Sequence, residues 1–305
     1  MDLTRVPPLL DLDTARATLA RRLSTLHERT FDLPEDAVVE SVPAREGACE
    51  GTWISTSEAP ARAGAILYLH GGGFHHRMPD LMNLFASHVS RATGLPVFVA
   101  HYRLAPAHTF PAPLHDAVAA YRCLLDQGVP AGRVVVLSES SGGTLALSML
   151  LELKAAGVSL PASVISYSPP TDLTLSSPSV DTNTAHDPGV DREMLTALIG
   201  GYLDGARPDQ APQSPLFGDL TGLPPLLLAV GEDEALLDDT LRLAKAADEA
   251  GGPVTVRVYE AMSHAFQAAV IDRTEDPTGQ MVLEHLAEWV RASLPRTVGT
   301  GGSDT

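Results

Sequence analysis

The chain has 305 residues, of which 44% are hydrophobic and 19% are charged, and its formal net charge is −17. This composition is typical of a globular protein and excludes a disordered or fibrous chain. The negative charge argues against binding to nucleic acid or to an anionic membrane surface, because both kinds of binding need clustered Lys and Arg.

The sequence also limits where the protein works. No apolar run is long enough to cross a bilayer, and residues 1–13 lack the apolar core of a signal peptide. Cys49 and Cys123 have the spacing neither of a disulfide-stapled secreted fold nor of a zinc site. We therefore expect a cytoplasmic protein, with a disordered tail at residues 298–305.

The first predicted element is an amphipathic helix. Asp13 can cap it, and apolar side chains from Ala15 to Leu26 fall on one face. Eight strand-like segments follow along the chain, at residues 37–42, 51–55, 65–69, 97–101, 134–138, 163–167, 226–230 and 254–259. Helical patterns separate most of them, near residues 80–93, 112–128, 141–157, 191–204, 235–250 and 278–293.

Short apolar strands that alternate with amphipathic helices predict an α/β fold. Its sheet should be mostly parallel and eight-stranded, with helices covering both faces. In such sheets ligands bind beyond the carboxyl ends of the strands, so the functional residues should directly follow strands. Residues 176–214, rich in Pro, Asp and Ser, break the alternation and indicate a lid-like excursion.

The strand at 65–69 is followed by His70-Gly71-Gly72-Gly73-Phe74. Consecutive glycines let the backbone approach a ligand closely and turn its N–H groups toward it. A phosphate loop is one interpretation, but no Lys-Ser or Lys-Thr pair follows. The other interpretation is an oxyanion hole beside a nucleophile.

The strand at 134–138 runs at once into Ser140-Ser141-Gly142-Gly143 and an apolar helix. A strand that turns directly into a helix, with small residues around a serine, is typical of a nucleophile elbow. Ser138 stands where the usual Gly-x-Ser-x-Gly pattern has its first glycine. The alternative is that these serines only cap the helix.

A nucleophilic serine needs a base and a carboxylate that orients the base. The strand at 226–230 is followed by an acidic run that includes Asp233 and Glu234, and the strand at 254–259 is followed by His264. Serine, acid and histidine thus all stand where functional residues are expected, in the chain order of α/β-hydrolases.

These motifs, with Tyr102-Arg103-Leu104-Ala105-Pro106 and Ser263-His264-Ala265-Phe266, resemble the hormone-sensitive-lipase-like α/β-hydrolases over roughly residues 37–294. The resemblance implies a serine hydrolase of carboxylic esters with Ser140 as nucleophile and His264 as general base. Alignment with the family's acidic motif favours Glu234 as the triad acid, with Asp233 as the rival. The implied oxyanion donors are the backbone N–H groups of Gly72, Gly73 and Ser141.

From this resemblance we expect one α/β-hydrolase domain at residues 1–297, with a helical cap built from about 1–36 and 176–214. Phe74 and His75 are candidate pocket residues. The substrate should be a small-molecule ester, and neither a cofactor nor a metal is expected. A homodimer through an exposed strand edge at 254–259 is a further expectation.

Two other functions stay open, and the Ser-Glu-Ser-Ser-Gly elbow, which is atypical for the family, suggests the first of them. One is a lyase or acyl-transfer enzyme that uses the same site, and the other is a non-catalytic ligand-binding protein of hydrolase fold. The five carboxylates between Glu232 and Asp239 predict a negative field beside the site. Such a field would favour neutral or cationic esters over anionic ones.

Overall fold

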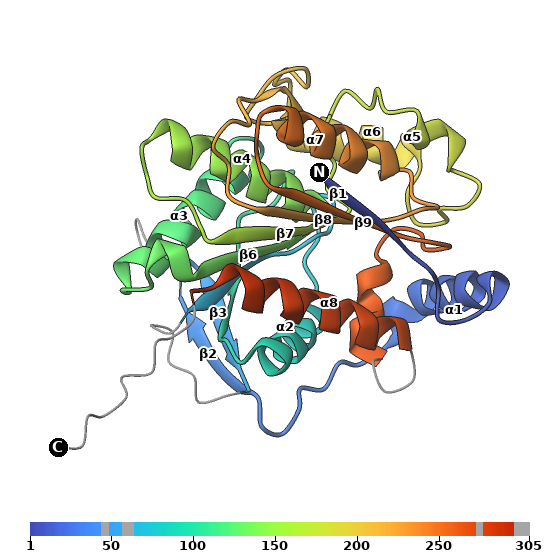
Figure 1. The fold of residues 1–305 in the computed structure, drawn as a ribbon, viewed down its shortest axis with the longest axis horizontal. Coiled ribbons are helices and arrows are strands. Elements are labelled where there is room, and N and C mark those ends of the chain that lie inside the picture. The colour runs from blue at the N-terminus through green and yellow to red at the C-terminus, as the bar shows by residue number, and fades with distance from the viewer. Residues whose placement is uncertain (44–48, 57–63, 273–276, 296–305) are drawn as a thin grey trace.

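The computed structural model of the protein describes residues 1–43, 49–56, 64–272 and 277–295. The predicted tail at 298–305 lies outside the described residues. At the centre is a nine-stranded sheet with the order β1-β9-β8-β7-β6-β4-β5-β3-β2 (Figure 1). The strands are β1 (Asp2–Val6), β2 (Val38–Val42), β3 (Gly51–Ser55), β4 (Ala65–Leu69), β5 (Val97–Ala100), β6 (Val134–Glu139), β7 (Ser163–Tyr167), β8 (Leu226–Gly231) and β9 (Val254–Tyr259).

The sheet is parallel apart from β3, which runs antiparallel to both of its neighbours, β2 and β5. The predicted α/β class and mostly parallel sheet are confirmed, and all eight predicted strands are present. The strand count was one too low. Sequence patterns missed β1, because only Val6 of its five residues is buried and the segment has no apolar run.

Strand β1 changes two expectations. It pairs with β9 in parallel register, from Asp2 opposite Thr255 to Val6 opposite Tyr259. Residues 2–6 therefore belong to the sheet and not to a cap. The edge of β9 that we expected to join two copies of the chain is covered by β1, so a homodimer cannot form through it in this arrangement.

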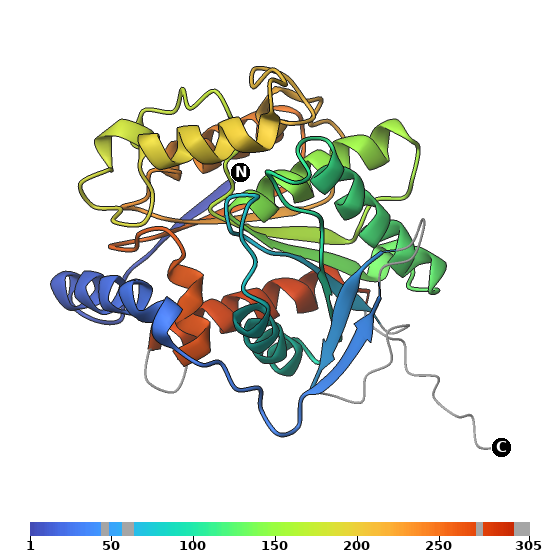
Figure 2. The same cartoon turned by 180° about the vertical axis from the view of Figure 1, so that it is seen from behind.

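Helices cover both faces of the sheet, with α3, α4 and α7 on one side and α2 and α8 on the other (Figures 1 and 2). Helix α1 begins after Asp11, whose carboxylate accepts a hydrogen bond from the Thr14 N–H at 3.0 Å, so the cap is Asp11 and not Asp13. The helices are α1 (Leu12–Thr25), α2 (Pro79–Thr93), α3 (Ala112–Asp126), α4 (Ser141–Ala155), α5 (Ser179–Thr182), α6 (Arg192–Leu203), α7 (Leu237–Glu249) and α8 (Pro277–Ser293). Four short 3₁₀ helices, η1 (Leu26–Glu28), η3 (Ala131–Arg133), η4 (Pro215–Phe217) and η5 (Phe266–Asp272), complete the described helices.

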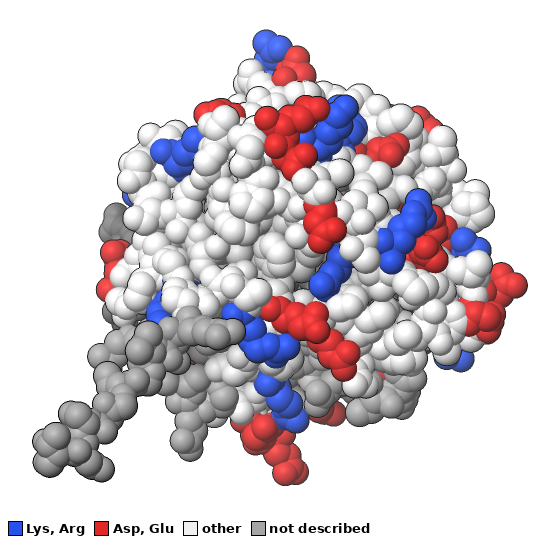
Figure 3. Space-filling view, viewed as in Figure 1, with Lys and Arg blue, Asp and Glu red and all other residues white. Residues whose placement is uncertain are grey.

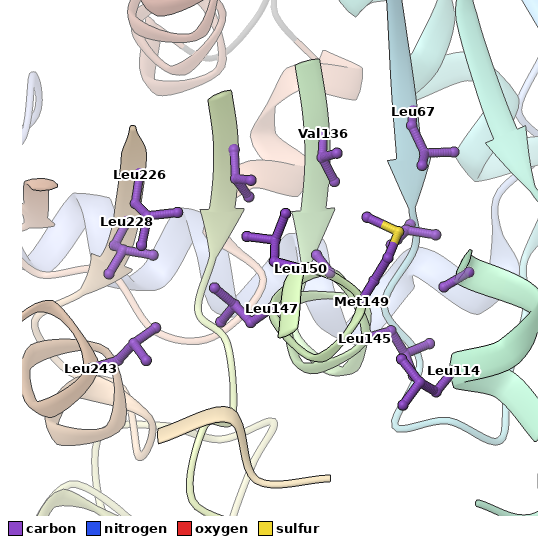
Figure 4. Packing of buried hydrophobic residues seen from close by; sticks show 14 of the residues in the cluster. Leu67, Leu114, Val136, Leu145, Leu147, Met149, Leu150, Leu226, Leu228 and Leu243 are labelled. Carbon is purple, nitrogen blue, oxygen red and sulfur yellow. The ribbon is translucent and has the colours of Figure 1, made fainter. Parts of the chain in front are cut away.

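The central strands are apolar on both faces because both faces are covered. In β4, Leu67 packs into the core on the α4 side, and Ile66 and Tyr68 pack into the core on the α2 side. Helix α4 is buried almost throughout, and its side chains Leu145, Leu147, Met149 and Leu150 pack against the central strands (Figure 4). This packing holds the amino end of α4 rigidly against the end of β6.

Cys49 and Cys123 form a disulfide that joins the segment before β3 to helix α3, across 74 positions of the chain. The expectation that the two cysteines do not staple the fold was therefore wrong. The sequence could not reveal the bond, because two cysteines far apart have the same spacing whether they are bonded or free.

Residues 176–214, which we call the cap segment, leave the sheet after β7 and return before β8. They carry α5 and α6, and α6 lies over the sheet on the same side as α7 (Figures 1 and 2). None of the described helices is long and apolar enough to cross a membrane.

Candidate active site

Three predicted residues meet at the carboxyl edge of the sheet. Ser140 follows β6, Glu234 follows β8, and His264 follows β9. Parallel strands place their carboxyl ends side by side, so residues far apart in sequence become neighbours there.

Ser140 occupies a strained turn between β6 and α4, with φ of 49° and ψ of −126°. The turn is tight because α4 begins directly against β4, where a Cβ atom on Gly142 would lie 2.1 Å from the carbonyl oxygen of Leu69. Ser138, at the position where glycine is usual, is fully buried, and its hydroxyl donates to the carbonyl of Ile165 at 3.2 Å. A serine is accommodated here because its hydroxyl has a partner.

A chain of hydrogen bonds links the three residues. The Nε2 atom of His264 lies 3.0 Å from Oγ of Ser140, and its Nδ1 lies 3.0 Å from Oε2 of Glu234. Asp233, the rival acid, points elsewhere and forms an ion pair with Arg16. Between the two candidate acids, the carboxylate facing the imidazole is that of Glu234.

Glu234 is fully buried, and its second oxygen accepts hydrogen bonds from the Ser168 hydroxyl at 2.7 Å and the Gly231 N–H at 2.6 Å. Burial alone would lower the pKa of His264, but the hydrogen bond and the charge of Glu234 outweigh it and raise the pKa above its ordinary value. A base paired in this way holds a proton strongly enough to accept it from a serine hydroxyl.

The glycine loop after β4 faces the same point. Gly72 and Gly73 have φ of 111° and 61°, and a Cβ atom on Gly72 would lie 2.2 Å from the carbonyl oxygen of His76. Within the described part of the chain, no hydrogen bond uses the N–H of Gly72 or Gly73. The N–H of Ser141 starts helix α4, where no intrahelical acceptor exists. The three N–H groups are thus available to bind an anion beside Ser140.

Buried polar contacts hold the glycine loop in place. Nδ1–H of His70 donates to the carbonyl of Gly71 at 2.6 Å, and the Tyr102 hydroxyl donates to the His70 carbonyl at 2.7 Å. Burial lowers the pKa of His70 to about 3, so the ring is neutral. His70 therefore orders the loop and does not act as a base near neutral pH.

Glu139, next to the nucleophile, ties three parts of the site together. One of its oxygens accepts hydrogen bonds from the Tyr68 hydroxyl at 2.6 Å and the Gly71 N–H at 3.2 Å. The other accepts from the side-chain amide of Gln267 at 2.6 Å. The elbow, the glycine loop and the segment after His264 are fixed relative to one another by this one carboxylate.

Ser140 and His264 open onto a cavity of about 500 Å³. Phe74 lines it, as expected, but His75 does not: its Nε2 atom lies 3.0 Å from the Leu198 carbonyl of α6, and the neighbouring His76 lines the cavity instead. The side chains that line its wall away from the catalytic residues are mostly apolar: Phe74, Met78, Leu81, Met82, Val190, Met194, Leu195, Leu198, Ile199 and Leu236.

The negative field that the acidic run after β8 predicts stays a prediction, but the carboxylates of this run all contact other groups of the chain. Each of the five carboxylates has an ion-pair partner or a hydrogen-bond donor. The partners are Arg5 for Glu232, Arg16 for Asp233, His264 for Glu234, the Ser179 N–H for Asp238 and the N–H groups of Thr171 and Asp172 for Asp239. Acidic and basic groups also lie side by side in several places on the face in Figure 3.

Two residues of the cap segment reach the site and were missed from the sequence. The Asp187 carboxylate accepts the backbone N–H groups of Ala235 and His264, and the Asn183 amide donates to the carbonyls of Glu232 and Glu234. Neither stands after a strand, so the rule that located the triad excludes them. Among the described residues, no three His, Cys, Asp or Glu side chains converge as metal ligands.

A serine in a strained elbow, a histidine and a buried carboxylate in this order on a sheet of this topology define an α/β-hydrolase site. A family model described as the α/β-hydrolase fold matches residues 66–268. The chain belongs to this family, among the hormone-sensitive-lipase-like members, as the motifs indicated.

Curated relatives and solved structures agree with that assignment. The chain is 40% identical over 220 residues to an acetyl-hydrolase of Streptomyces hygroscopicus, covering 72% of this chain and 73% of the relative. It is 34% identical over 235 residues to an esterase of Acinetobacter venetianus, covering 77% of each. The crystal structure of an esterase from the bacterial hormone-sensitive lipase family superposes with a TM-score of 0.84 at 33% identity, covering 93% of this chain and 98% of that one.

Proposed function

We propose that the protein hydrolyses small carboxylic esters through an acyl-enzyme on Ser140, with His264 as general base and Glu234 as the orienting acid. The observation that carries this proposal is the continuous chain Glu234–His264–Ser140, with both hydrogen bonds at 3.0 Å, at the floor of an apolar cavity. The chain is a carboxylic ester hydrolase, in keeping with its family and with relatives named acetyl-hydrolase and esterase.

In the first half of the reaction, Oγ of Ser140 attacks the ester carbonyl as its proton passes to Nε2 of His264. Glu234 stabilises the imidazolium that forms. The carbonyl oxygen becomes an oxyanion, which the N–H groups of Gly72, Gly73 and Ser141 bind. One such donor typically lowers the barrier by about 3–4 kcal/mol. His264 then gives the proton to the leaving alcohol, and the acyl group stays on Ser140.

In the second half, water attacks the acyl-enzyme and His264 takes its proton. The oxyanion forms at the same three N–H groups, collapses, and releases the acid as the proton returns to Ser140. These steps use only groups of the chain and water.

The cavity supports a substrate with an uncharged, short or medium acyl group. Its volume of about 500 Å³ suits a small ester, and no Lys or Arg is among its described lining residues to pair with a substrate carboxylate. Met194, Leu195 and Leu198 of α6 form part of this wall, so we propose that the cap segment sets the chain-length preference.

A series of p-nitrophenyl esters from acetate to palmitate tests the proposal. We expect turnover of the short esters, which Ser140→Ala should lower at least about 1,000-fold. Ser148→Ala is the matched control, because it removes a buried hydroxyl from the same helix, where it bonds to the Pro212 carbonyl away from the cavity. It should keep activity within about threefold.

The outcomes separate the alternatives. Turnover that survives in Ser140→Ala would remove the nucleophile assignment. A fluorophosphonate that labels Ser140 in a protein without ester turnover would favour the lyase or acyl-transfer function. If the protein neither reacts with the fluorophosphonate nor hydrolyses any ester, the ligand-binding function is favoured. The cytoplasmic location and a homodimer stay predictions.

A further inference from the structure

One carboxylate of the cap segment lies between two catalytic loops. Asp187 stands between α5 and α6 and is only 2% exposed. One of its oxygens accepts the N–H of Ala235 at 2.9 Å, and the other accepts the N–H of His264 at 3.2 Å. Ala235 directly follows the triad acid, so the two oxygens contact the acid loop and the histidine loop separately.

A second side chain of the same segment strengthens this connection. The amide of Asn183 donates to the carbonyls of Glu232 and Glu234 at 3.1 and 3.0 Å. Asn183 and Asp187 are themselves joined by a backbone hydrogen bond of 3.0 Å. Asn183 and Asp187 together therefore make four hydrogen bonds to the two loops that carry Glu234 and His264.

The charge of Asp187 also bears on the chemistry. No Lys or Arg of the described chain forms an ion pair with it, and the ionisable groups that influence it are His264 and Glu234. Burial raises the pKa of Asp187, and Glu234 raises it further, whereas His264 lowers it. A carboxylate in this position is stabilised when His264 becomes an imidazolium, and it stabilises that imidazolium in return.

We propose that Asp187 is a positioning residue of the active site. Its two oxygens fix the distance between the acid loop and the histidine loop, and its charge adds to that of Glu234 in favouring protonated His264. This role rests on the triad proposed above. It also makes the cap segment part of the catalytic apparatus, because the hydrogen bonds that align Glu234 and His264 come from the cap.

The substitution Asp187→Asn tests the proposal with little change in volume. An amide has one acceptor oxygen, so one of the two N–H groups loses its partner, and the charge disappears. We expect kcat to fall at least about tenfold with KM within about twofold, because the substrate cavity is not lined by Asp187. The matched control is Asp181→Asn, a carboxylate of the same segment that is 63% exposed and pairs with Arg192; it should keep wild-type kcat.

The pH profile separates this role from simple support of the fold. The acidic limb of kcat/KM reports the ionisation of His264 in the free enzyme. The carboxylates that raise the pKa of His264 are Glu234, Asp187 and Glu139. Without the charge of Asp187 the imidazolium is less stable, so the limb should move to lower pH by about half a unit or more. Asp187→Glu keeps the charge, so its acidic limb should lie at the wild-type pH. Its longer side chain should still lower kcat.

Two results would overturn the proposal: wild-type kcat in Asp187→Asn, or a lowered kcat with an unshifted acidic limb. If Asp187→Asn does not fold, Asp187→Ser removes the same charge, leaves room for water and carries the same expectations. Failure of the proposed function is distinguishable, because it would show as activity that survives in Ser140→Ala, whatever the variants of Asp187 do.

Discussion

Arg16 forms a two-point ion pair with Asp233, with Nε 2.7 Å from Oδ2 and Nη2 3.1 Å from Oδ1. The pair joins helix α1 to the loop that carries the triad acid, across 217 positions of the chain. It also explains why the carboxylate next to Glu234 cannot serve His264: its oxygens are held by a guanidinium on the outer side of the loop.

The two neighbouring acids should therefore respond oppositely to substitution. Glu234→Gln should lower kcat about 10³- to 10⁴-fold with little loss of stability, because it removes the charge that stabilises the imidazolium. Asp233→Asn should lower kcat less than about tenfold. It should cost about 1–2 kcal/mol in the free energy of unfolding, a value between those of exposed and buried pairs.

Initial rates and urea unfolding of both variants measure these effects. Arg16→Gln is the control for Asp233→Asn, since it breaks the same ion pair from the other side and should lose stability without losing the triad. A larger loss of kcat in Asp233→Asn than in Glu234→Gln would mean that the acid is assigned one residue too late.

Activity should fall on the acid side of neutrality. The general base acts only when His264 is neutral, and the hydrogen bond and charge of Glu234 raise its pKa above 6.5 despite burial. As pH falls through that raised pKa, the imidazole takes up a proton and kcat/KM declines, so the acidic limb should lie above pH 6.5. A profile of kcat/KM for a neutral ester from pH 5 to 9 checks this, and a limb below 6.5 would contradict it.

The disulfide between Cys49 and Cys123 should stabilise the fold without serving catalysis. Closing a loop across 74 positions reduces the entropy of the unfolded chain, which corresponds to a stabilisation of up to about 4 kcal/mol. The variant Cys49→Ser/Cys123→Ser should therefore unfold at a lower temperature, yet keep its kcat at 25 °C because neither cysteine lines the cavity. Thiol titration of the denatured wild-type protein should find no free thiol unless a reductant is added.

Esters with a neutral acyl group should be preferred to anionic ones. The mostly apolar wall of the cavity has no Lys or Arg among the lining residues that the structure describes, so burying a substrate carboxylate there is costly. We expect kcat/KM for a butyrate ester to exceed that for the matched succinate monoester at least about tenfold. Equal values would show that a cation or water reaches the acyl group.

Residues that follow apolar strands could be found from the sequence. Ser140, Glu234 and His264 stand at such positions, where the topology of a parallel sheet fixes their meeting point. Small residues around Ser140 and the glycines at 71–73 added local signals, because tight turns restrict which residues fit. The central strands β4 to β8 were predicted to within one residue at each end, because both of their faces are buried and their apolar runs end where the strands end.

Features that depend on pairing across long separations could not be found. The residues of β1 are mostly exposed and carry no apolar pattern, and only backbone hydrogen bonding to β9 makes them a strand. Asp187 lies in a segment without periodicity, and its importance comes from two N–H groups some 50 and 80 positions away. Likewise, nothing near Arg16 or Asp233 in the sequence indicates that they meet.

The pairing of β1 with β9 has a consequence for the order in which the protein is assembled during synthesis. Residues 2–6 are synthesised some 250 residues before their partner, residues 254–259. Until then β1 has no strand to pair with. The ion pair between Arg16 of α1 and Asp233 cannot form either, because Asp233 is also synthesised late. The contacts of β1 and α1 with β9 and with the loop after β8 can therefore form only after residues 226–259 have been synthesised.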